Sequence, residues 1–421
     1  MSLPDNPLPL DLEFVRNAFA GLEPHAGDHG PQGEQPWLFF DNAGGAFVLE
    51  EVIERTAEYL RSTPVQIGAS YPRSKLAADR QSEAIAKLAK WINAGHEQEV
   101  IVGPSASALT LRLAISFGDT LVEGDEIIVT SMDHEANRTP WLRLAKQGAV
   151  IRTWMAGPDG TMNLDDLDAL LNDRTRLVCL GHCSNIVGNI EPVREVADKV
   201  HAAGAKLFVD GVAYAPHRPV DVRELDADFY VFSLYKTFGP HAGLLWGKRQ
   251  LLLDLPGINH EFVANDYLPY KFQPGGANYE LTWGSAAIPD YLSALDEHQG
   301  GTGDRTIAWA AIADHESQLA RRLLDYLDAR EDITILGSSS ADPAQRLPII
   351  SFTIAGRKSQ DVVQQLEQQH IAARFGNFHA KRLIEQFGLE PADGVVRVSF
   401  AHYNALEDVD RLVDALEGIK G

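Results

Sequence analysis

Short runs of β-forming apolar residues alternate along the chain with longer stretches in which apolar residues recur at helical spacing. Strands that alternate with helices in this way predict a mostly parallel sheet with helices on both faces. The predicted strands cover 99–102, 126–130, 150–154, 176–180 and 205–209, and the predicted helices include 74–93, 108–117, 164–172 and 192–203.

The same pattern divides the chain into three parts. Residues 1–36 are rich in Pro, Gly and Asp and predict an N-terminal arm, with a short amphipathic helix over 11–22. Residues 37–300 hold the alternating elements of a large domain. Helices over 284–298 and 306–329 lead to a smaller C-terminal α/β domain, residues 301–421, on which the N-terminal segment is a candidate to pack.

Composition narrows the class of protein. The chain has 421 residues and 45% hydrophobic content, which suffices for a large core and more than one domain. The net charge of −22 argues against nucleic acid and anionic membranes as partners. No apolar run is long enough for a membrane span, and no signal-like leader opens the chain. The two cysteines, Cys179 and Cys183, show no zinc-binding spacing. We therefore expect a cytoplasmic protein without a bound metal.

Candidate chemistry is concentrated at Lys236. A β-forming run ends in Ser233-Leu234-Tyr235-Lys236, and a Gly-Pro breaker and the apolar run 242–246 follow. This pattern predicts two buried strands joined by a tight turn. A lysine in a desolvated pocket has a lowered pKa and can form a Schiff base with an aldehyde. A surface lysine at a strand end would give the same local pattern, so the interpretation needs a second feature.

Asp210 supplies that feature, because it ends the preceding apolar run, 205–209. Pyridoxal phosphate needs a lysine for its aldehyde and a carboxylate that keeps its ring nitrogen protonated, so that the ring can accept electrons. A strand-terminal aspartate alone is equally typical of a turn or a helix cap. The pair together indicates pyridoxal phosphate.

With these motifs the chain resembles the class V aminotransferase branch of the fold-type I pyridoxal-phosphate enzymes. Within that branch it is most similar to the group II cysteine desulfurases and their relatives, from about Phe39 to the C-terminus. The resemblance implies an α/β fold-type I transferase fold, with a mostly parallel sheet and a smaller C-terminal α/β domain. Active sites in such sheets lie at the carboxyl ends of the strands.

The resemblance implies a set of cofactor contacts. A strand, a small-residue turn and a helix N-terminus at 99–117 form an anion site, and Ala106 and Ser107 match the turn that binds the phosphate. His134 matches the imidazole that stacks on the pyridine ring. Asn185 matches a residue that approaches the ring hydroxyl or the substrate carboxylate.

Three positions that contact the cofactor in the family differ in this chain. The phosphate-binding Ser-x-His of the family corresponds to Ser233-Leu234-Tyr235 in this chain. Ser233 matches, whereas the hydroxyl of Tyr235 stands in place of an imidazole. Ala213 replaces a glutamine that bonds the ring oxygen. Gly276 replaces a threonine that reaches the phosphate of the neighbouring subunit, where a backbone N–H would have to serve. The segment still favours a homodimer with shared sites.

Substrate contacts follow from the same resemblance. Asn42 and Ala43 match a segment at the mouth of the active site. Arg397 matches the arginine that holds the substrate α-carboxylate, with Arg374 as a second candidate. His379 stands where group II desulfurases carry their nucleophilic cysteine, so it either protonates a leaving group or lines the pocket.

The sequence therefore predicts an enzyme that acts on an α-amino acid, with Lys236 as the general base at Cα. Without the lid cysteine, C–S bond cleavage by β-elimination is favoured slightly over transamination, and epimerisation or racemisation is a further alternative. A cofactor-binding regulatory protein without turnover is the non-enzymatic alternative. A spectral response to added amino acids would distinguish an enzyme from such a protein.

Overall fold

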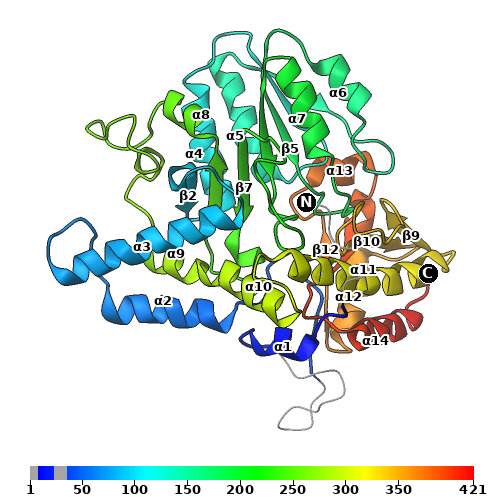
Figure 1. The fold of residues 1–421 in the computed structure, drawn as a ribbon. Helices are drawn as coiled ribbons and strands as arrows, with labels where there is room; N and C mark the ends of the chain where they lie inside the picture. Colours follow the sequence, from blue (N-terminus) through cyan, green and yellow to red (C-terminus); the bar gives the residue numbers. More distant parts are fainter. Residues whose placement is uncertain (1–7, 23–35) are drawn as a thin grey trace.

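The computed structural model describes residues 8–22 and 36–421 (Figure 1). Most of the predicted arm lies outside these residues. Within it, helix α1 (Leu12–Asn17) is capped by Asp11, whose side chain accepts a hydrogen bond from the backbone N–H of Phe14. The predicted helix over 11–22 is thus shorter than expected.

A seven-stranded sheet forms the centre of the larger part, in the order β2-β8-β7-β6-β5-β3-β4. Only β8 runs antiparallel to its neighbours among these strands, which confirms the predicted mostly parallel sheet. The strands are β2 (Val100–Gly103), β3 (Glu126–Thr130), β4 (Val150–Trp154), β5 (Thr175–Gly181), β6 (Lys206–Asp210), β7 (Phe229–Ser233) and β8 (Gly243–Gly247).

Helices cover both faces of this sheet (Figure 1). Strand β6 is apolar on both faces. Leu207 and Val209 belong to one apolar cluster, and Phe208 between them belongs to another. Successive side chains of a strand point to opposite faces, so a strand apolar throughout must be covered twice. The helices around this sheet are α2 (Glu50–Ser62), α3 (Pro72–Trp91), α4 (Ala106–Gly118), α5 (Thr139–Leu142), α6 (Leu164–Leu170), α7 (Val193–Ala202), α8 (Arg249–Asp254), α9 (Tyr279–Ser285) and α10 (Ala287–His298).

A second, antiparallel sheet of four strands lies in the C-terminal part, in the order β12-β13-β10-β9. Its apolar face packs on the second half of α11 (Thr306–Asp328), whose first half packs on the core of the large sheet. The strands are β9 (Ile333–Leu336), β10 (Ile349–Ile354), β12 (Arg374–Gly376) and β13 (Val395–Ser399), and the remaining helices are α12 (Ser359–Glu367), α13 (Lys381–Gln386) and α14 (Leu406–Glu417).

The N-terminal segment joins the C-terminal part. Strand β1 (Leu38–Phe39) pairs in parallel with β11 (Ile371–Ala372), and Asp41 forms a further bridge with Ser399. Residues directly after the arm therefore lie beside the C-terminal sheet, although they precede the large sheet in the sequence. The domain limits at 36/37 and 300/301 stay a prediction.

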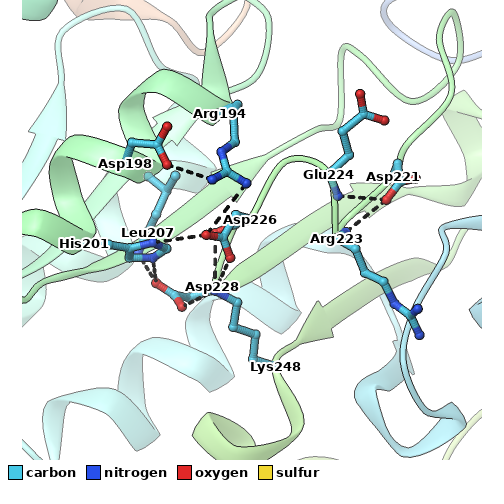
Figure 2. Close-up of polar contacts among 10 residues, drawn as sticks. All are labelled: Arg194, Asp198, His201, Leu207, Asp221, Arg223, Glu224, Asp226, Asp228 and Lys248. Atoms are coloured by element: carbon cyan, nitrogen blue, oxygen red, sulfur yellow. Dashed lines mark hydrogen bonds and ion pairs between the residues drawn. The ribbon is translucent and has the colours of Figure 1, made fainter. Parts of the chain in front are cut away.

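A polar cluster lies where β6 and β7 begin and β8 ends, opposite the carboxyl ends of the parallel strands. Figure 2 shows its side chains. Asp228, just before β7, accepts hydrogen bonds from the backbone N–H of Leu207 in β6 at 2.8 Å and from His201 at 2.8 Å. Lys248, just after β8, lies 2.7 Å from Asp226 and 3.0 Å from Asp228. Two carboxylates and one ammonium thus join the ends of three strands.

We expect Asp228→Ala to lower the free energy of unfolding by about 1 to 3 kcal/mol, because a buried N–H and the partners of the carboxylate lose their acceptor. Urea denaturation measures the change. Asp198→Ala is the control, since Asp198 is exposed and pairs with Arg194 on the same helix. Equal losses in the two variants would contradict a structural role for the cluster.

Candidate active site

Lys236 lies at the carboxyl end of β7, in a short 3-10 turn over 234–236. Burial and the nearby charge of Arg397 lower the pKa of Lys236 to about 8. The cavity around it also contains most of the predicted cofactor contacts. Its lining comprises Ala106, Ser107, Met132, Asp133, His134, Ala136, Gly181, Cys183, Ser184, Asn185, Asp210, Val212, Ala213, Ser233, Tyr235 and Lys236.

Asp210 ends β6, next to β7, so the pairing of these strands brings it to the same cavity as Lys236. One carboxylate oxygen accepts a hydrogen bond from the backbone N–H of Val212 at 2.9 Å. Burial raises the pKa of Asp210 to about 6, although the Val212 N–H and the positive charge of Lys236 oppose the shift. A protonated ring nitrogen in the cavity would stabilise the ionised form.

The start of α4 forms the anion-binding end of the cavity. Ser105 caps this 13-residue helix through a hydrogen bond from the Ala108 N–H, which leaves the first turn at Ala106 and Ser107 facing the cavity. Gly243 permits this arrangement, since a Cβ there would lie 2.4 Å from the Ala106 nitrogen. Free N–H groups, a helix dipole and the hydroxyls of Ser107 and Ser233 suit a phosphate.

His134 follows β3 and lines the cavity with its ring. Its Nδ1 accepts a hydrogen bond from the Ala136 N–H at 3.0 Å. Burial and then the charge of Lys236 lower the pKa of His134 to about 3, so the ring is neutral. A neutral, fixed imidazole suits stacking on a flat cofactor.

Asp133 lines the cavity and links the segment after β3 to the end of β5. Its carboxylate accepts hydrogen bonds from the Gly181 N–H and from the side chain of Asn137, each at 2.8 Å. Burial and the neighbouring charge of Asp210 raise the pKa of Asp133 to about 7. Asp133 was not among the predicted site residues.

The segment 376–380 of the C-terminal part is fastened over the cavity. The Asn185 side chain donates to the carbonyl of Phe378 at 2.9 Å, and the Glu135 N–H donates to the carbonyl of His379 at 2.7 Å. Phe378 and His379 both have positive φ, 48° and 59°. Such backbone conformations are costly for residues other than glycine and concentrate at functional sites. The exposed ring of His379 lies 5.1 Å from that of His134, at the rim of the cavity.

Both predicted arginines converge on Asp41, which the sequence analysis did not single out. Arg397 donates from Nη2 to one oxygen of Asp41 at 3.1 Å, and Arg374 lies 2.6 Å from the other. Arg397 is buried, whereas the side chain of Arg374 is 59% exposed. The ring of Phe378 covers the guanidinium of Arg397 at 3.7 Å. Asp41 directly precedes Asn42 and Ala43, which match a family segment at the mouth of the active site, and this position is the local signal for it.

Six predicted residues do not line this cavity; besides Arg374, His379 and Arg397, these are Asn42, Ala43 and Gly276. The side chain of Asn42 donates to the Ser399 carbonyl at 2.8 Å and accepts a hydrogen bond from Tyr403, so it fastens the N-terminal segment to the C-terminal part. Ala43 donates its N–H to the Ser399 hydroxyl. Gly276 lines a separate cavity with Tyr267. Their roles toward substrate or a neighbouring subunit stay predictions.

Two further properties concern the described parts of the chain, 8–22 and 36–421. No helix there combines the length and apolar character that crossing a membrane requires. Among the same residues, no three His, Cys, Asp or Glu side chains are grouped so as to bind a metal ion.

Comparison with known proteins assigns the fold. The structure is similar to the cysteine desulfurase CsdA from Escherichia coli, with a TM-score of 0.81 and 28% identity over 97% of this chain and 98% of that chain. It is also similar to the cysteine desulfurase of Thermococcus onnurineus NA1, with a TM-score of 0.80 and 26% identity over 91% and 94% of the two chains. The predicted fold-type I architecture is confirmed by these neighbours.

Sequence relatives cover nearly the whole chain. It is 43% identical over 415 residues to the aminotransferase-like protein FGM3 of Gibberella zeae, covering 96% of this chain and 98% of that protein. It is 36% identical over 431 residues to the cysteine desulfurase-like protein ustD of Aspergillus flavus, covering 97% and 91%. The profile of the family described as aminotransferase class-V matches residues 38–412, which include every residue placed around the Lys236 cavity, and the chain therefore belongs to the class V aminotransferase family.

Proposed function

We propose that the chain binds pyridoxal phosphate at Lys236 and cleaves the C–S bond of a cysteine-type amino acid by β-elimination. The observation that carries the proposal is one cavity that unites a lysine of lowered pKa, a buried carboxylate and the N-terminus of a helix. These three features match the aldehyde, the ring nitrogen and the phosphate of this cofactor.

Each part of the cavity has a distinct task in this proposal. Ser107 and the first turn of α4 hold the phosphate, Asp210 accepts a hydrogen bond from the ring nitrogen, and His134 covers the ring. When bound, the cofactor takes up the substrate nitrogen and accepts the electron pair left at Cα. Lys236 Nζ removes the Cα proton, a role that its lowered pKa favours near neutral pH.

Arg397 orients the substrate in this proposal. A guanidinium can bind a carboxylate with two parallel hydrogen bonds, which fixes the direction of the Cα–H bond toward Lys236. The C–S bond then breaks as the Cα proton leaves, and the departing sulfur takes a proton. His379 lies at the rim, where an imidazole can supply that proton.

A protein thiol as sulfur acceptor is disfavoured. Cys179 and Cys183 are the two cysteines of the sequence, and both are buried. Burial raises the pKa of both thiols, so neither forms the thiolate that attacks sulfur. Release of free sulfide thus fits the site better than transfer through a persulfide.

Product analysis tests the proposed function. The purified protein, loaded with pyridoxal phosphate, is mixed separately with cysteine, cystine, alanine and aspartate. Pyruvate, ammonia and sulfide from cysteine in equal amounts support β-elimination. A keto acid together with the pyridoxamine form of the cofactor would instead establish an aminotransferase. No spectral response to any amino acid would favour a cofactor-binding protein without turnover.

The cysteines give a separate prediction. We expect the double variant Cys179→Ala/Cys183→Ala to retain elimination activity within about twofold of the wild type, because neither thiol takes part. Intact-mass measurement of wild-type protein during turnover should show no added sulfur atom. A persulfide on Cys183, or loss of sulfide release in the double variant, would contradict this prediction.

Arg397→Lys is expected to lower kcat/KM for the amino acid about 10- to 100-fold, chiefly through KM. Lysine keeps the charge but cannot form the two parallel hydrogen bonds of a guanidinium. Steady-state kinetics measure the change. Arg322→Lys is the matched control, since Arg322 is an exposed arginine paired with Asp410. An unchanged KM in Arg397→Lys would show that the substrate carboxylate does not bind at Arg397.

A further inference from the structure

The hydrogen bonding of Arg397 is incomplete in a specific way. Nη1 donates to the Asn185 carbonyl at 3.2 Å and Nη2 donates to Asp41 at 3.1 Å. Nε is buried and has no hydrogen-bond partner among the described residues. The Arg397 side chain is 2% exposed, so an unpaired N–H there carries a cost that a bound acceptor would remove.

The unpaired Nε and the Nη2 held by Asp41 lie on the same edge of the guanidinium. A carboxylate that binds an arginine side-on uses these two N–H groups together. Asp41 holds Nη2 with one oxygen, and its second oxygen lies 2.6 Å from Arg374. Nη2 carries two N–H groups, so a ligand carboxylate on this edge would lie beside the negative charge of Asp41, and like-charge repulsion favours withdrawal of Asp41 from Nη2 toward Arg374.

We propose that Asp41 is an internal competitor for the carboxylate site of Arg397, and that an incoming carboxylate displaces it onto Arg374. This inference rests on the proposed function, which assigns Arg397 to the substrate carboxylate, and it makes Asp41 a residue that sets affinity at that site. Arg374 has the complementary task, because it holds Asp41 both before and after the exchange.

The surroundings of Asp41 permit such a movement. Its backbone is fixed by the bridge to Ser399 and by the Gly44 N–H, which donates to the Asp41 carbonyl at 2.9 Å. The exchange therefore requires only rotation of a short side chain. Gly44 leaves room for the Asp41 carboxylate in its observed position, since a Cβ at Gly44 would lie 2.6 Å from an Asp41 oxygen. Arg374, with its largely exposed side chain, can follow the carboxylate outward.

Propionate binding to the cofactor-loaded protein tests the proposal by isothermal titration calorimetry. Propionate has a carboxylate but neither an amino group nor a leaving group, so its binding reports the arginine site whether or not the chain catalyses elimination. We expect Asp41→Asn to bind propionate at least about tenfold more tightly than the wild type, because the competing charge is gone. Asp410→Asn removes the same charge at an exposed pair and should bind like the wild type.

A second variant keeps the charge and moves it. Gly44→Ala should push the Asp41 carboxylate away from the two arginines and, like Asp41→Asn, tighten propionate binding.

Arg374→Gln should weaken propionate binding in the wild type, and weaken it less in the Asp41→Asn background, because Arg374 then no longer has a displaced carboxylate to hold.

Several results would overturn the proposal. These are a folded Asp41→Asn variant that binds propionate no more tightly than the wild type, and propionate that binds none of the proteins. If Asp41→Asn and Gly44→Ala do not fold, a crystal structure of the wild type with propionate decides. The expected structure has propionate on Nε and Nη2 of Arg397 and Asp41 on Arg374 alone. Propionate elsewhere, with Asp41 still on Nη2, would contradict the exchange.

Discussion

Lys236→Ala is expected to abolish covalent attachment of pyridoxal phosphate and to lower turnover about 10⁴-fold. Two functions are lost together, since the same amine binds the aldehyde and removes the Cα proton. Reduction with borohydride followed by peptide mass spectrometry locates the attachment, and it needs no knowledge of the substrate. In the wild type the label should appear on Lys236.

Lys271 provides the internal comparison. It is also buried with a lowered pKa, but its ammonium donates to the carbonyls of Leu253, Leu255 and Asn265. An ammonium held by three acceptors is not available as a nucleophile, so Lys271 should carry no label. The exposed Lys381→Ala variant should attach the cofactor like the wild type. Covalent cofactor in Lys236→Ala would refute the assignment of the active site.

The pKa of Lys236 adds a pH dependence to this prediction. Below about pH 8 the amine is mostly protonated and cannot attack an aldehyde, and above it the neutral form predominates. The rate at which cofactor-free protein captures pyridoxal phosphate should therefore rise with pH and level off above about 8. An ordinary lysine would continue to gain reactivity toward its usual pKa of about 10.4. Stopped-flow absorbance measures the profile.

Much of the fold could be predicted because local pattern and global fold agree. Strand β6 has an apolar run that ends in Asp210, and β7 has one that ends at Lys236, so each signal lies within a few residues. Parallel pairing then brings both residues to the same edge of the sheet. The predicted helix over 284–298 was less accurate, since the structure has α9 and α10 with Ala286 between them.

The parts that could not be predicted depend on contacts between distant segments. Asp41 meets Arg397 because β1 pairs with β11 and the following residues run beside β13. Nothing in the local sequence around residue 41 reports that pairing. For the same reason Asn42 was assigned to the substrate by its motif, whereas its side chain contacts Ser399 and Tyr403. Register within one element can be read locally, but such long-range pairing cannot.

Glu316→Gln is expected to destabilise the protein by about 3 to 5 kcal/mol, because it breaks a buried ionic network. Glu316 lies on α11 between the two cores, with its side chain fully buried. One oxygen is 2.8 Å from His217 and the other accepts from Arg218 at 3.0 Å. The variant leaves the buried Arg218 without its counter-charge. For a chain of this length the loss corresponds to a thermal midpoint lower by about 3 to 6 °C.

The matched control is Asp325→Asn, an exposed acid on the same helix, which should leave the midpoint unchanged.

Burial alone would raise the pKa of Glu316, but His217 and Arg218 outweigh it, so the net pKa is lowered. A lowered pKa in the folded state stabilises the protein above the unfolded value of about 4.3, and the effect is lost as pH falls through the folded value. The difference between wild type and Glu316→Gln should therefore narrow below about pH 4.3. A difference that stays constant at low pH, or one no larger than that of Asp325→Asn, would show that packing around α11 rather than this charge joins the two cores.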